Sequence, residues 1–186
     1  MAQTIDTSKW QLVGSARTAL LDISGGFYRL RREIEALAGL DVAERSLYAA
    51  GGEGGRSIFS AMLARGELQR NEVGFVSGVE TYTQAGFGQF SISQLDVGAA
   101  RATLTCPDAF ESWAFVQNHA PAERAVCAYS AGVLAALMAQ VTGRDDVACV
   151  ETACVAAGGA TCTFEVAPAA ESMRQRSLTD ASDVAR

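Results

Sequence analysis

The spacing of apolar positions predicts a helix near the N-terminus. From Ala16 to Leu37, apolar residues recur at alternating steps of four and three, which is typical of one face of a helix. Ser15 is a suitable N-cap and Gly39 a suitable stop. Gly25-Gly26 interrupts the stripe at a cost of about 1 kcal/mol per glycine, and indicates a kink or a close backbone contact. We expect the apolar face to be either a core face or the seam of a homodimer.

Two further helical regions follow. One begins near Asp41 and resumes at Arg56, and another runs from about Glu72 to Ala85. The G-G-E-G-G stretch before Arg56 reads as an interruption of the first region. It lacks the G-K-[ST] ending of a phosphate-binding loop, and no strand clearly precedes it. The sequence therefore argues against nucleotide binding there.

The second half of the chain contains strand patterns. Residues 87–95 and 100–106 read as two strands around a glycine-containing turn. In the second strand, polar and small or apolar residues alternate, as in a half-buried strand: Arg101, Thr103 and Thr105 against Ala102, Leu104 and Cys106. The remaining elements are a short helix at 108–117, a helix rich in small residues from Cys127 to about Val141, and strands at 147–155 and 161–166.

This order of elements predicts an α+β fold with N-terminal helices packed on an antiparallel sheet. We expect a single domain over residues 1–168. Its helical part, about 10–85, is also the expected dimerisation part, and about 87–167 carries the cysteines. Residues 169–186 form a tail that is either a surface helix or disordered.

Composition narrows the choice of partner and compartment. The net charge of −6 offers no overall attraction to nucleic acid. The one basic cluster, Arg29 with Arg31 and Arg32, is expected to be the exposed face of a helix. No apolar run approaches the roughly 18 residues of a membrane span, and the polar N-terminus lacks a signal-peptide core. We expect a cytoplasmic protein, whose five cysteines are metal ligands or buried thiols rather than disulfides.

Three cysteines and a glutamate have the spacing of a single metal site. They are Cys127, Glu151, Cys154 and Cys162. Cys154 and Cys162 are eight positions apart across a glycine turn, so a hairpin can bring both sulfurs to one side. Cys127 begins a helix that can lie across this hairpin. Three thiolates and one carboxylate saturate a tetrahedral Zn²⁺ and leave no position for a catalytic water. The pattern therefore indicates a structural zinc.

Two alternatives remain at this point. Cys149 lies two residues before Glu151, so both side chains face the same way in a regular strand. A ligand set in which Cys149 replaces Glu151 is chemically reasonable. Free cysteines are also common as small buried apolar residues, with no metal at all.

The residues around these ligands resemble a known family. The stretch C-A-Y-S-A-G-V … E-T-A-C-V-A-A-G-G-A-T-C-T-F-E-V is similar to the signature of the four-vinyl-reductase (4-vinyl reductase) domain family. In that family a Cys, a Glu-x-x-Cys and a Cys eight positions later recur. Residues from about Ser15 to Arg65 are similar to the N-terminal part of the effector-binding domains of phenol- and xylene-responsive bacterial activators. The resemblance covers roughly residues 10–167.

The resemblance implies a fold related to nitric-oxide-signalling and Golgi-transport ligand-binding domains. It also implies a structural zinc beside a closed hydrophobic pocket for a small molecule. The implied zinc ligands are Cys127, Glu151, Cys154 and Cys162. The chain departs from the sensors because their pocket tryptophan and tyrosine align with Cys106 and Cys149, which argues against phenol itself. No ATPase or helix-turn-helix segment follows, so we expect a separate effector protein.

Apolar residues expected to face inward around the metal unit are the candidate pocket walls. They are Phe90, Ile92, Leu104, Cys106, Phe110, Trp113, Tyr129, Val133 and Cys149. A largely apolar cavity with few polar groups is usual for a small-ligand site. Trp113 and Tyr129 combine a flat apolar body with one hydrogen-bonding group. The only histidine, His119, lies in an H-A-P loop and is expected to be exposed, so a hydrolytic triad is not expected.

Three functions are compatible with these features. The first is a zinc-stabilised sensor or carrier that holds a hydrophobic or aromatic small molecule. The second is an enzyme or accessory factor acting on the vinyl group of a tetrapyrrole in bacteriochlorophyll biosynthesis. The third is an acyl-binding interaction module. A saturated zinc and the lack of a nicotinamide or flavin fingerprint favour a non-enzymatic role, and thus the first.

Overall fold

The computed structural model describes residues 21–171. A short π-helical turn, η2 (Ile23–Phe27), opens this part of the chain. The elements that follow are α1 (Tyr28–Ala38), α2 (Leu40–Ala64), α3 (Glu72–Gln84), β1 (Ser91–Asp96), β2 (Arg101–Cys106), α4 (Phe110–Gln117), α5 (Ala128–Thr142), β3 (Val147–Ala153), the 3-10 turn η3 (Val155–Ala157) and β4 (Cys162–Pro168). Among these helices none is long and apolar enough to cross a membrane.

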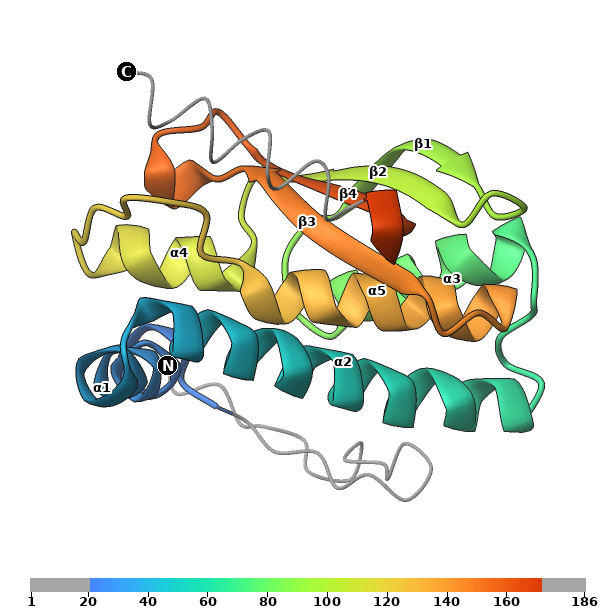
Figure 1. The fold of residues 1–186 in the computed structure, drawn as a ribbon, viewed down its shortest axis with the longest axis horizontal. Coiled ribbons are helices and arrows are strands. Elements are labelled where there is room, and N and C mark those ends of the chain that lie inside the picture. The colour runs from blue at the N-terminus through green and yellow to red at the C-terminus, as the bar shows by residue number, and fades with distance from the viewer. Residues whose placement is uncertain (1–20, 172–186) are drawn as a thin grey trace, which may run out of the picture.

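The elements form three layers (Figure 1). The four strands make one antiparallel sheet in the order β1-β2-β4-β3. Helix α5 packs against β3 and β4 on one side and against α2 on the other. This central position explains why α5 is apolar all round and buried over most of its length. The α+β fold with an antiparallel sheet is confirmed, but α2 packs mainly on α5 rather than directly on the sheet.

Helix α2 runs without a break through the G-G-E-G-G stretch, so the expected interruption there is wrong. A Cβ atom at Gly51 would lie 2.1 Å from the carbonyl oxygen of Tyr129, and one at Gly132 would lie 2.1 Å from that of Tyr48. The glycines thus let the backbones of α2 and α5 meet directly. This gain in packing offsets the low helix propensity of glycine.

The N-terminal helix is shorter than the apolar stripe predicts within the described residues. Asp22 caps η2 by accepting the backbone N–H of Gly25 at 3.1 Å, and Gly25 and Gly26 both lie inside this π turn. The predicted N-cap Ser15 lies outside the described residues. Phe27 is buried, whereas Leu30 and Leu37 on α1 are 55% and 85% exposed. The stripe is therefore not a core face along its whole length.

The main hydrophobic core lies between the sheet and α5 and includes residues of α2 and α3. Strand β2 has the predicted alternation, with Ala102, Leu104 and Cys106 buried and Arg101 exposed. A smaller cluster of Phe27, Leu47 and Phe110 joins η2, α2 and α4. The N-terminal end of α5 is the end nearest to this cluster, and it carries Cys127.

Candidate metal centre

Four predicted ligands come together at the N-terminal end of α5. The ligand atoms of Cys127, Glu151, Cys154 and Cys162 all lie within 4.8 Å of one another. The Sγ atom of Cys162 is 3.8 Å from that of Cys127 and 4.0 Å from that of Cys154. All five cysteines lie in the described part of the chain, and none is in a disulfide there.

Each ligand is positioned by its secondary structure. Cys127 is the N-cap residue of α5, while the other three come from the β3–β4 hairpin. Glu151 and Cys154 are three positions apart and would face opposite sides of a regular strand. A bulge between Glu151 and Ala153, where Thr152 is the additional residue, changes this alternation. Both side chains consequently point to Cys127.

Cys149 is not a member of this group. It is 1% exposed and belongs to the main hydrophobic core, opposite Val166 in the sheet. Its backbone N–H donates to the hydroxyl of Tyr48 at 3.1 Å. Of the two ligand sets compatible with the sequence, the geometry thus favours the one that contains Glu151.

The residues present fit a tetrahedral thiolate-bound cation. Zinc–sulfur bonds of about 2.3 Å in a tetrahedron separate the sulfurs by about 3.8 Å, close to the distances above. The Oε2 atom of Glu151 accepts the backbone N–H of Cys127 at 2.7 Å. Its Oε1 atom is buried without a hydrogen-bond partner among the described residues. A buried oxygen in this condition is costly unless something compensates it, and a cation at the centre of the four ligands would do so.

Burial and mutual contacts shift the pKa values of the four ligands. Burial, with the neighbouring Cys154, raises the pKa of the Glu151 carboxyl to about 9. Burial also raises the pKa of the Cys127 thiol well above its usual value. Hydrogen bonds from Cys127 and Cys154 lower the pKa of Cys162 to about 5. A thiol or carboxyl must lose its proton to bind a cation, so metal binding at these residues would release protons.

Most of the predicted pocket walls lie in the core. Phe90, Leu104, Cys106, Val133 and Cys149 are buried in the main cluster, and Ile92 packs against it. Phe110 belongs to the smaller cluster, with Tyr129 partly buried beside both. Trp113 is 42% exposed, so the expectation that it faces inward is wrong. His119 is exposed, as predicted.

An aromatic cluster next to the metal centre joins two of the predicted wall residues, Phe110 and Tyr129, to Tyr82 and Phe87, which were not predicted. The rings of Tyr82 and Phe87 stack with centroids 4.4 Å apart, and Phe87 lies 6.3 Å from the nearly parallel ring of Tyr129. Phe110 meets both Phe87 and Tyr129 edge-on. The hydroxyls of Tyr82 and Ser130 are 3.2 Å apart inside this region. No local motif marks these residues, because they come from α3, α4, α5 and the segment after α3.

A buried charged pair was also not predicted. Arg31 is 1% exposed, so the expectation that it belongs to an exposed basic face is wrong, although Arg29 and Arg32 are exposed. Its Nη1 atom is 3.9 Å from Oε1 of Glu111, which is fully buried. Glu111 accepts the backbone N–H groups of Tyr129 at 3.0 Å and Ser130 at 2.9 Å. A carboxyl at this position complements the positive end of α5.

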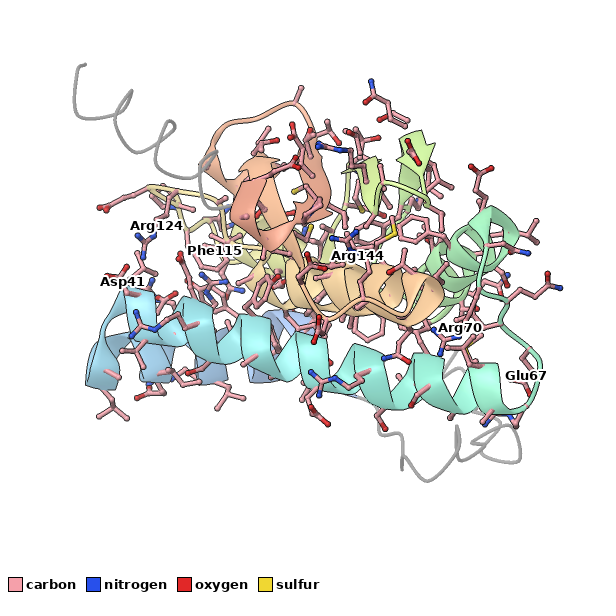
Figure 2. All side chains as sticks on the ribbon, turned by 45° about the vertical axis from the view of Figure 1, so that its right-hand side comes forward. Asp41, Glu67, Arg70, Phe115, Arg124 and Arg144 are labelled. Carbon is pink, nitrogen blue, oxygen red and sulfur yellow. The ribbon has the colours of Figure 1, made fainter. Side chains whose placement is uncertain are left out.

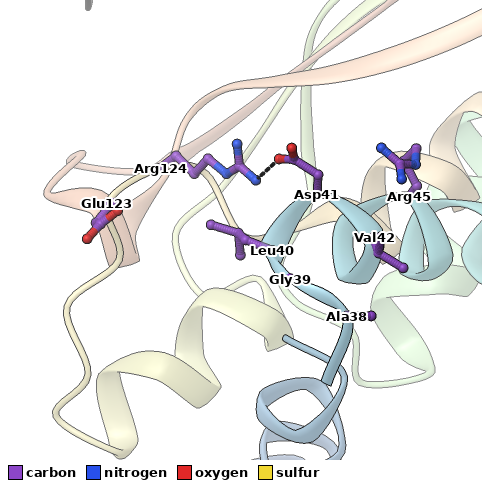
Figure 3. Close-up of a pocket in the computed structure, with 8 residues that line it drawn as sticks. All are labelled: Ala38, Gly39, Leu40, Asp41, Val42, Arg45, Glu123 and Arg124. Atoms are coloured by element: carbon purple, nitrogen blue, oxygen red, sulfur yellow. Dashed lines mark hydrogen bonds and ion pairs between the residues drawn. The ribbon is translucent and has the colours of Figure 1, made fainter. Parts of the chain in front are cut away.

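Two hollows on the surface are unrelated to the predicted pocket walls. One, of about 440 Å³, lies at the α1–α2 junction, where Arg124 pairs with Asp41 (Figure 3). The other, of about 500 Å³, lies beside Leu68 and Gln140. Figure 2 shows Arg124 and Asp41 near each other at one end of the molecule. Neither hollow is lined by a residue predicted to form the pocket.

The comparisons with known proteins agree with this fold. Residues 111–168 match the four-vinyl-reductase domain family, which confirms the resemblance found around the cysteines. A search of curated proteins found no match. The phenol-responsive sensory domain of the transcription activator PoxR, crystallised with phenol, has a TM-score of 0.72 and 19% identity over 82% of this chain and 77% of that one.

Two other solved structures are similar. A vinyl-4-reductase family protein from Methanocaldococcus jannaschii has a TM-score of 0.53 and 14% identity, over 90% of this chain and 97% of that one. Trafficking protein particle complex subunit 3 from Naegleria fowleri, covalently bound to palmitic acid, has a TM-score of 0.53 and 11% identity, over 76% of this chain and 90% of that one. These likenesses establish a shared fold.

Proposed function

We propose that the protein is a zinc-stabilised small-molecule-binding protein, which acts as a sensor or carrier. The observation that carries this proposal is the convergence of Cys127, Glu151, Cys154 and Cys162, with the buried Glu151 Oε1 lacking a partner among the described residues. The similarity to a phenol-responsive sensory domain supports the sensing role.

Zinc is the cation that suits this ligand set best. Thiolates are soft ligands, and tetrahedral sites with three sulfurs are typical of zinc. When bound, the ion supplies positive charge and a crosslink between the start of α5 and the β3–β4 hairpin. Since four protein ligands complete its coordination, it offers no open position to a substrate. The site is therefore structural in this proposal.

The small molecule is hydrophobic or aromatic in this proposal. The interior beside α5 is lined by the rings of Tyr82, Phe87 and Tyr129, and the hydroxyls of Tyr82 and Ser130 are its polar pair. Such a combination orients a ligand that has one polar group. Cys106 and Cys149 stand where the resemblance places the aromatic pocket residues of the phenol sensors, so a different ligand is expected.

Ligand entry requires movement of core side chains. A Cβ atom at Gly78 would lie 2.4 Å from Cδ1 of Leu137, so Leu137 fills the space between α3 and α5. Leucine can adopt other staggered rotamers at a modest cost. We propose that this side chain moves when the ligand binds.

Signalling in this proposal passes through a homodimer or a separate effector protein. The exposed Leu30 and Leu37 on α1 are the candidate dimer contacts. Exposed apolar side chains grouped on one helix are typical of an interaction surface.

Action on a tetrapyrrole vinyl group is the second candidate function. The match to the four-vinyl-reductase domain family and the similarity to a vinyl-4-reductase family protein favour it. The closed ligand set at the metal argues against reduction at the zinc itself. An acyl chain would be the expected occupant if the protein instead resembled the trafficking subunit in function.

Native mass spectrometry of protein purified from its own host tests these proposals together, because it measures metal, bound molecule and stoichiometry. We expect one zinc per chain and a retained small apolar or aromatic molecule. A tetrapyrrole or a fatty acid as the retained molecule would replace the first function by the second or the third. Protein that is folded but contains no zinc would overturn the proposal.

A further inference from the structure

The backbone around Cys127 is fixed by three side chains, of which Arg31 and Glu111 are fully buried and Glu151 is partly buried. Arg31 donates from Nη1 to the carbonyl oxygen of Val126, immediately before the ligand. Glu151 accepts the N–H of Cys127 at 2.7 Å. Glu111 accepts the backbone N–H groups of Tyr129 and Ser130 in the first turn of α5. The segment that presents Cys127 is thus held from both the metal hairpin and α1.

The environment of Arg31 is unusual for a residue that only adds stability. Its guanidinium lies 5.0 Å from the ring centroid of Phe115 and pairs with Glu35 at 2.8 Å. Its Nη2 atom is buried without a hydrogen-bond partner among the described residues. Burying a charge that is incompletely paired costs free energy and often brings little net stability. A role in fixing the position of Val126 explains why the charge is placed here.

The loop before Cys127 is tied to the same N-terminal elements. Asn118 donates to the carbonyl oxygen of Ser24 at 2.8 Å. Arg124 pairs with Asp41 at 2.6 Å (Figure 3), and with Glu44 at 2.8 Å. These contacts join the loop to η2 and to the first turn of α2. The loop is thus tied to the elements on either side of α1.

We propose that Arg31 and Glu111 are positioning residues that couple the docking of α1 to the metal centre. This inference rests on the proposed function, because it requires a metal at the four ligands. With the metal bound, the Val126 carbonyl is held where Arg31 reaches it. Without the metal, the start of α5 separates from the hairpin and α1 loses this contact.

The length and exposure of α1 make it sensitive to this contact. The helix has 11 residues, which is too short to be stable alone in water. It therefore depends on its docking through Phe27, Arg31 and neighbouring contacts. Coupling is reciprocal, so a weakened α1 must also weaken metal binding by the same factor. The exposed Leu30 and Leu37 would transmit the metal state to a partner.

Hydrogen–deuterium exchange of the full chain, with and without one equivalent of zinc, tests the coupling. In the wild type, we expect amides of α1 to exchange at least tenfold faster after a chelator removes the metal. In Arg31→Met, α1 should exchange fast in both states. Arg29→Met is the matched control, because Arg29 lies on the same helix with its side chain 78% exposed.

Zinc affinity provides the reciprocal measurement. Competition with a chromophoric chelator should show zinc binding about tenfold weaker in Arg31→Met, the usual effect of losing a residue that orients a metal ligand. Arg31→Lys, which retains a donor for Val126, should recover part of this loss, and Arg29→Met should bind zinc as the wild type does.

The outcomes separate this inference from the proposed function. Wild-type protein that binds zinc but shows unchanged exchange in α1 after metal removal would overturn the coupling and leave the metal site intact. Wild-type protein that binds no zinc would overturn the proposed function, and the coupling with it. The wild-type measurement decides the question even where Arg31→Met does not fold.

Discussion

The carboxylate of Glu151 accepts the backbone N–H of Cys127 at 2.7 Å, so one member of the candidate metal centre positions another. The contact joins β3 to the N-cap residue of α5 across 24 positions of sequence. It leaves the second carboxylate oxygen free to meet a cation. Loss of this hydrogen bond would therefore disturb both the fold around Cys127 and the metal site.

Replacing Glu151 tests the ligand set. We expect Glu151→Ala to lose most of its zinc, because one of four ligands and the acceptor for Cys127 are both removed. Metal analysis of the purified variants by inductively coupled plasma mass spectrometry measures the effect. Cys149→Ala is the control, since Cys149 lies outside the cluster, and it should keep one zinc per chain. Zinc retained by Glu151→Ala and lost by Cys149→Ala would make Cys149 the ligand instead.

Glycines of α2 provide a matched test of the α2–α5 contact. Gly51→Ala should lower the free energy of unfolding by more than about 2 kcal/mol, because its Cβ would meet the backbone oxygen of Tyr129. A Cβ at Gly52 would lie 3.8 Å from the Gly132 oxygen, which is an ordinary contact. Gly52→Ala should therefore be neutral or stabilising by about 0.5–1 kcal/mol. Urea unfolding of both variants checks this, and equal losses would contradict the close approach.

The metal ligands can be predicted from the sequence better than their surroundings. The hairpin length is local, so Cys154 and Cys162 can be grouped from the order of residues alone, whereas the choice of Glu151 over Cys149 came from the family resemblance. The bulge at Thr152 was not predicted, although it is what brings Glu151 and Cys154 to one side. Residues whose burial depends on contacts with residues far away in the sequence were predicted poorly.

Arg31 and the glycines of α2 illustrate this limit. The spacing around Arg31 is that of an exposed helix face, yet the partners that bury it, Glu111 and Val126, are 80 or more positions away. Similarly, Gly51 reads as a helix breaker until its contact with Tyr129 on α5 is known. Trp113 was assigned inward because of its apolar character, but its place on α4 turns it to solvent.

Stability should depend on pH through Glu111. Burial raises the pKa of its carboxyl from 4.5 to about 7, so the folded protein holds the proton more tightly than the unfolded chain. The resulting stability is fully present below about pH 4.5 and is lost as the pH rises through about 7. Each unit of such a shift corresponds to about 1.4 kcal/mol.

The variant Glu111→Gln isolates this effect, because an amide does not titrate. Its free energy of unfolding should fall less than that of the wild type across this pH window in urea titrations. Zinc binding strengthens with pH in both proteins. The difference between their free energies of unfolding at each pH therefore reports on Glu111. Identical pH profiles would show that Glu111 has an ordinary pKa in the folded protein.

The exposed apolar face of α1 is expected to hold two copies together. Leu30→Glu should convert a dimer to monomers, because it places a charge at the seam. Multi-angle light scattering measures the mass. Val73→Glu, at a residue of α3 that is 66% exposed, is the control and should not change it. A Leu30→Glu variant with the mass of the wild type would reject this interface.

Zinc K-edge X-ray absorption on the purified protein identifies the metal and its ligand atoms in one measurement. We expect about one zinc per chain, with three sulfurs at about 2.3 Å and one oxygen at about 2.0–2.2 Å. A first shell of four sulfurs, a shell of oxygens and nitrogens alone, or no stoichiometric zinc would contradict this expectation.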